Sequence, residues 1–144
     1  MDLDWEKLVR RYVWDDTRTP YFTRASRLSP AQARYELFAY AVLMAVLFGV
    51  LALAALSPRG PHGGAAIVPV YAFSVLCAAV VLGATRHLAA ALWCAAAPLA
   101  VLAYFAAFGF HPGLEMADRV VLVVVVLAWS AYGARVVAIA RAMP

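Results

Sequence analysis

Four long stretches of apolar residues, separated by short polar or breaker-rich segments, dominate the pattern along the chain. They cover residues 37–56, 67–84, 88–108 and 120–139. At about 1.5 Å per helical residue, each stretch matches a hydrocarbon core about 30 Å thick. None alternates as membrane β-barrel strands do, and a bilayer admits only helices and closed barrels. The pattern predicts an all-α integral membrane protein, with a four-transmembrane-helix bundle over residues 30–144.

The first span has a clear predicted start. Ser29 suits the N-cap position, Pro30 the first helical position, and Gln32 the third, which together make a capping box. The helix should therefore begin near Pro30, about two turns before the apolar stretch. Those turns carry Arg34 and Glu36. We expect Glu36 to lie beside Arg34 among the lipid headgroups.

Residues 1–29 are predicted to form a cytoplasmic arm that contains a short amphipathic helix over residues 4–16. Its apolar residues recur along one side of a helix: Trp5, Leu8, Val9, Tyr12 and Val13. Arg10 and Arg11 lie on the other side. A helix this short is marginal alone in water, so its apolar side needs a surface. We favour the inner membrane surface. The alternative is a partner protein, which the extended, partly acidic segment at residues 15–22 would suit better than lipid.

Composition and charge narrow the class further. Apolar residues make up 66% of the chain and charged residues 14%, a balance that a small soluble domain could not bury. The net charge of +4 is best explained by topology, so no nucleic-acid partner is expected. The twelve Lys and Arg residues divide ten to two, with Arg59 and Arg119 opposite all the others. Because basic residues mark the cytoplasmic side, both termini are predicted to be cytoplasmic. The Ala-rich, Arg-rich composition favours a bacterial inner membrane.

Arg135 is the charged residue placed deepest in a predicted span. Fifteen uncharged residues separate it from Arg119, a length shorter than the hydrocarbon core. We favour an interpretation in which the two side chains extend to opposite membrane surfaces. The alternative is a functional charge inside the bundle, because intramembrane charges are costly and are often functional.

The outer side offers a weak metal-site candidate, which consists of His62, His111, Glu115 and Asp118. Imidazole and carboxylate groups can bind divalent metals. However, Pro112 and Gly113 interrupt the helical spacing between His111 and Glu115, so loop polarity is the better explanation. No metal or cofactor is predicted.

The remaining candidates are interpreted as packing or anchoring residues. Cys77 and Cys94 are equally far from the turn at residues 85–86, which would suit a redox thiol pair, but cysteines inside spans more often pack as small apolar residues. Aromatic residues near the span ends are interpreted as interfacial anchors: Tyr35, Tyr40, Tyr71, Trp93, Phe105, Phe108 and Phe110.

No catalytic, cofactor-binding or transport motif stands out. We therefore expect a non-catalytic accessory, assembly or scaffold subunit of a larger bacterial inner-membrane complex. Its partners would be the lipid bilayer and either other membrane-protein subunits or further copies of itself. One alternative is a small oligomeric transporter or channel whose path is lined by Arg135, Pro98 and Tyr132. A membrane enzyme that acts on lipid or quinone is less favoured.

Overall fold

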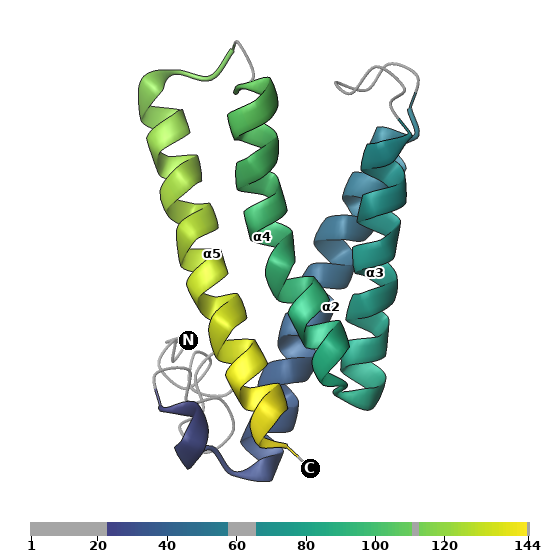
Figure 1. Cartoon of the computed structure of the whole chain (residues 1–144), viewed down its shortest axis with the longest axis vertical. Helices are drawn as coiled ribbons and strands as arrows, with labels where there is room; N and C mark the ends of the chain where they lie inside the picture. The colour runs from purple at the N-terminus through teal and green to yellow at the C-terminus, as the bar shows by residue number, and fades with distance from the viewer. Residues whose placement is uncertain (1–22, 58–65, 111–112, 144) are drawn as a thin grey trace, which may run out of the picture.

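Four long helices make up most of the protein (Figure 1). The computed structural model describes residues 23–57, 66–110 and 113–143. A 3₁₀ helix, η1 (Ala25–Arg27), precedes α2 (Pro30–Ala55), α3 (Ile67–Thr85), α4 (Leu88–Phe108) and α5 (Met116–Ala142). Each of α2 to α5 is long and apolar enough to cross a membrane. The described part of the chain is thus all-α, and its four apolar helices indicate a multi-pass membrane protein. The predicted amphipathic helix lies outside the described residues.

Local sequence determines where α2 begins. The Ser29 hydroxyl oxygen accepts a hydrogen bond from the Gln32 backbone N–H at 3.2 Å. The Gln32 side-chain oxygen accepts one from the Ser29 backbone N–H at 2.9 Å. With Pro30 as the first helical residue, the predicted capping box and helix start are both confirmed.

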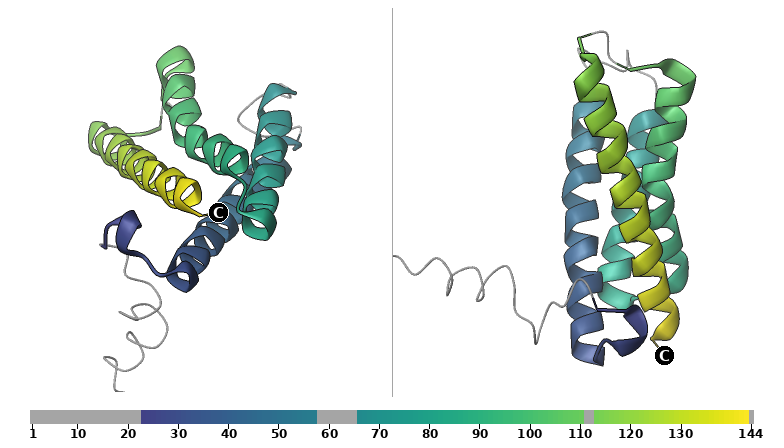
Figure 2. Two further views of the ribbon diagram at one scale, coloured as in Figure 1. Left: turned by 60° about the horizontal axis from the view of Figure 1, so that its bottom comes forward. Right: turned by 90° about the vertical axis from the view of Figure 1, so that its left-hand side faces the viewer.

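The helices pack as two antiparallel hairpins, α2 with α3 and α4 with α5 (Figure 1). Packing within each hairpin is far more extensive than packing between α2 and α5. The hairpins converge at the end where α2 begins, α3 turns into α4, and α5 finishes. Toward the opposite end, α4 and α5 diverge from α2 and α3 (Figures 1 and 2).

The core shared by all four helices lies in the converging half of the protein, whereas the core between α2 and α3 continues into the other half with Phe48, Ala52 and Ala72. In α4 the buried residues end at Pro98, and in α5 they begin only at Val126. Pro98 stands at the middle of α4, where it lacks the N–H that would continue the helix hydrogen bonding. The helix changes direction near its middle (Figure 2), as a proline kink predicts.

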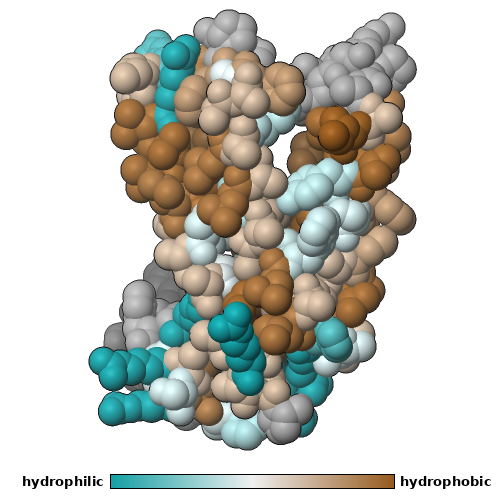
Figure 3. Space-filling view, in the orientation of Figure 1, coloured by the Kyte–Doolittle hydropathy of each residue, from teal (hydrophilic) through white to brown (hydrophobic). Residues whose placement is uncertain are grey.

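We call the converging end the arginine-rich end, because it carries Arg24, Arg27, Arg34, Arg86, Arg135 and Arg141. Figure 3 shows polar side chains gathered at this end, with apolar surface over the helices above it. Polar groups at the ends and apolar groups along the helices fit a protein that crosses a membrane.

Candidate functional site: a buried ion pair beside an aromatic cluster

An ion pair joins α2 to α5 inside the arginine-rich end. Arg135 Nε lies 2.5 Å from Glu36 Oε1, and Arg135 Nη2 lies 3.0 Å from Glu36 Oε2. The Glu36 side chain is 2% exposed and that of Arg135 is 19% exposed. A guanidinium that donates two parallel hydrogen bonds to a carboxylate makes the strongest and most directional type of protein ion pair.

Arg135 also fixes the segment that precedes α2. Its Nη1 donates a short hydrogen bond to the backbone carbonyl of Thr23. The adjoining helix η1 packs against α5 as well. One guanidinium therefore holds together α2, α5 and the point at which the N-terminal arm joins the four helices.

The expectation that Glu36 lies beside Arg34 among headgroups is wrong. On α2, Glu36 falls on the same side as Leu37 and Tyr40, which are both fully buried, whereas Arg34 is on the exposed side. Glu36 is buried against Arg135, which is turned toward it instead of extending to the surface. The sequence does contain a signal for this pair, because Glu36 near the start of α2 and Arg135 near the end of α5 have opposite charges and lie at similar depth.

An aromatic cluster connects all four helices next to the ion pair. Ring centroids lie 5.7 Å apart for Tyr40 and Tyr132, and 6.2 Å apart for Phe48 and Trp129. Both pairs bridge α2 and α5. Two further ring pairs, Phe48 with Tyr71 and Tyr71 with Trp93, extend the second pair across α3 and α4. The first pair adjoins these rings because Tyr132 follows Trp129 by three residues on α5. We call the six residues the aromatic cluster: Tyr40, Phe48, Tyr71, Trp93, Trp129 and Tyr132. Such ring pairs contribute about 0.5–1.5 kcal/mol each beyond the area they bury.

Internal acceptors satisfy several polar atoms of the cluster. The Tyr40 hydroxyl donates to the Cys94 carbonyl at 3.4 Å, and Trp93 Nε1 donates to the Ser74 hydroxyl oxygen at 3.2 Å. The Ser74 hydroxyl in turn donates to the Tyr71 carbonyl at 2.7 Å. These bonds tie α2 to α4 and α3 to α4. Interfacial anchoring is therefore not the main role of Tyr40, Tyr71 and Trp93. Their main interactions are inside the protein.

The two cysteines differ in their surroundings. Cys94 is fully buried in the core, which confirms its predicted role as a packing residue. Cys77 is exposed on α3. Both are free thiols.

The two acidic residues proposed for the outer metal site instead cap α5. Glu115 is the N-cap residue, and its backbone N–H donates to Asp118 Oδ2 at 3.2 Å. A reciprocal bond from the Asp118 backbone to the Glu115 side chain completes a capping box. Within the described ranges no group of three or more metal-binding side chains occurs. His62 and His111 lie outside those ranges.

Fold and site together define a multi-pass α-helical membrane protein whose polar interior consists of an internal ion pair and an aromatic cluster. Comparisons with protein families, curated proteins and solved structures found no match.

Proposed function

We propose that the protein is a non-catalytic accessory, assembly or scaffold subunit of a larger complex in the bacterial inner membrane. The observation that carries this proposal is the three-way interaction of Arg135 with Glu36 and the Thr23 carbonyl. It gives the N-terminal arm a fixed point of departure from the four helices. A docking arm benefits from such a fixed point, because less conformational freedom is lost when it binds.

The charged groups inside the spans support a structural role over transport. The charges of Glu36 and Arg135 neutralise each other, so neither side chain needs an ion or a substrate for charge balance. Transport paths use charges that exchange partners during the cycle. An Arg135 held by a carboxylate and a backbone carbonyl is poorly suited to that exchange, which makes the transporter or channel the weaker candidate.

Surface composition supports a partner inside the membrane. In the diverging half, α4 and α5 carry large exposed apolar residues, including Leu99, Phe108, Val121 and Val125. Between 22% and 33% of each span's most apolar window is buried within the chain. The hairpins thus leave extensive apolar helix surface for neighbouring subunits as well as lipid.

The proposal also specifies orientation. The arginine-rich end would face the cytoplasm by the positive-inside rule, with both termini on that side. The arm would then present its apolar side, formed by Trp5, Leu8, Val9, Tyr12 and Val13, to a partner at the inner membrane surface. Arg10 and Arg11 would bind anionic lipid or acidic groups of that partner.

Co-purification tests this function. The wild-type chain, tagged at its C-terminus and extracted from its native membrane in mild detergent, should co-purify with a partner at fixed stoichiometry, as measured by native mass spectrometry. Deletion of residues 1–22 should remove that partner. Leu8→Asp should act like the deletion, whereas Glu6→Gln on the opposite side of the predicted helix should not. Purification of the wild-type chain as a lone monomer would contradict the proposal.

A further inference from the structure

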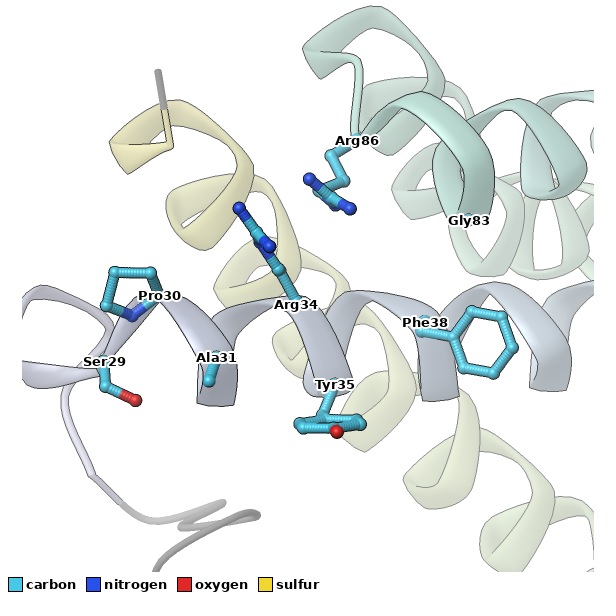
Figure 4. Close-up of a pocket in the computed structure, with 8 residues that line it drawn as sticks. All are labelled: Ser29, Pro30, Ala31, Arg34, Tyr35, Phe38, Gly83 and Arg86. Atoms are coloured by element: carbon cyan, nitrogen blue, oxygen red, sulfur yellow. The ribbon is translucent and has the colours of Figure 1, made fainter.

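A shallow cavity of about 680 Å³ opens at the arginine-rich end, between the first turns of α2 and the turn that joins α3 to α4 (Figure 4). It is lined by Ser29, Pro30, Ala31, Arg34, Tyr35, Phe38, Gly83 and Arg86. None of these residues takes part in the ion pair or the aromatic cluster. The cavity is therefore separate from the site described above.

Two guanidinium groups face each other across this cavity (Figure 4). Arg34 projects from α2, and Arg86 projects from the residue that ends α3. The Arg86 backbone has a left-handed conformation with φ of 59°, which is unfavourable for a residue other than glycine. This residue is the C-cap of α3, and its N–H donates to the Leu82 carbonyl, as is common where a helix ends in the left-handed conformation.

No carboxylate in the described part of the chain neutralises these two charges. The acidic residues there are Glu36, Glu115 and Asp118. Glu36 is bound to Arg135, and the other two cap α5 at the opposite end of the protein. Two cations that line one cavity repel each other, and an anion bound between them removes that repulsion.

The apolar part of the lining suits a lipid. Tyr35 and Phe38 are 53% and 57% exposed beside the arginines, at the point where the apolar stretch of α2 begins. A headgroup held by Arg34 and Arg86 would lie at the level of the membrane surface. Its acyl chains could then run along Phe38 and the exposed apolar residues that follow it, such as Val42 and Val46.

We propose that Arg34 and Arg86 together bind the phosphate group of an anionic phospholipid. Guanidinium groups match phosphate oxygens with paired hydrogen bonds, and basic pockets between transmembrane helices on the cytoplasmic side are suited to anionic headgroups. This inference rests on the cytoplasmic orientation of the arginine-rich end given under the proposed function, but not on the accessory-subunit role, because it concerns lipid and not a protein partner.

Lipid titration followed by native mass spectrometry tests the proposal. The purified full-length chain should bind phosphatidylglycerol more tightly than phosphatidylcholine. The double variant Arg34→Gln/Arg86→Gln should lose about 30-fold in phosphatidylglycerol affinity, as expected for two arginines at a membrane surface. Each single variant should lose about fivefold. The matched control is Arg27→Gln/Arg141→Gln, which removes two exposed arginines from the same end. It should retain the wild-type preference.

Three other outcomes would overturn the proposal. Equal losses in the double variant and its control would mean general surface attraction without a site. If inorganic phosphate raised the melting temperature as much as phosphatidylglycerol does, the cavity would bind a soluble anion and not a lipid. Lipid binding that appears only after deletion of residues 1–22 would mean that acidic residues of the arm occupy the cavity.

Unchanged thermal stability of the double variant in neutral detergent, without lipid, would exclude misfolding as the cause of its lost affinity.

Discussion

Replacing Glu36 with Ala is expected to destabilise the protein by about 3–5 kcal/mol, the usual effect of removing one partner of a buried ion pair. Arg135 would keep its positive charge in a largely buried position and would lose both hydrogen bonds to the carboxylate. The hydrogen bond from Arg135 to the Thr23 carbonyl would remain. The measurement is the free energy of unfolding from an SDS titration in mixed micelles.

Two further variants separate charge from volume. Glu36→Gln preserves the size of the side chain but removes its charge, and it should recover little stability. The double variant Glu36→Met/Arg135→Met should be much more stable than Glu36→Ala, because apolar residues of similar size often replace a buried ion pair with little loss. Arg141→Ala, an exposed arginine on the same helix, should unfold with the wild-type midpoint. A Gln variant as stable as wild type would show that the pair contributes nothing.

Gly133→Leu is expected to separate α4 from α5 and to destabilise the protein by about 3 kcal/mol, the upper end of the usual range for overpacking. A Cβ atom added at Gly133 would lie 3.2 Å from two atoms of Ala95, one in its backbone and one in its side chain. Because the backbone of Ala95 is fixed within α4, this crowding can be relieved only if a whole helix moves. Small residues at such positions allow transmembrane helices to approach closely.

A graded series checks this second prediction. Gly133→Ala should destabilise the protein by about 1 kcal/mol, less than Leu does, because it adds one carbon atom. The matched control is Gly49→Ala, where the added Cβ would meet only Leu76 Cδ1 at 3.9 Å. That variant should be neutral or up to about 1 kcal/mol more stable, since Ala favours helix over Gly. Equal effects at the two glycines would contradict the close packing of α4 on α5.

The sequence predicted the helices well because their determinants are local. The four apolar stretches correspond to α2, α3, α4 and α5, and the capping box at Ser29 located the start of α2 to the residue. Helix α5 extends beyond its apolar stretch at both ends, to Met116 and Ala142. Its start follows from the capping box that Glu115 forms with Asp118, two residues that the sequence alone assigned to loop polarity or a metal site.

The candidate site was harder to predict, since its residues are distant in sequence. Arg135 was recognised as an intramembrane charge, but its partner Glu36 is 99 positions away. The sequence shows that the spans contain the aromatic residues Tyr40, Tyr71 and Trp93. It does not show that they meet, because that depends on which side of each helix faces its neighbours. The cavity between Arg34 and Arg86 likewise depends on how α2 lies against the turn after α3.

Sequence by itself thus determined that this protein is helical, that it has four apolar spans and where α2 begins, because hydrophobic length and helix caps act within a few residues of each other. Only the tertiary structure decided that Glu36 neutralises Arg135, that the hairpins converge at the arginine-rich end, and that Arg34 and Arg86 share a cavity. Those relations depend on helix rotation and crossing. In a membrane, both are set by close packing between side chains from different helices, which no local pattern encodes.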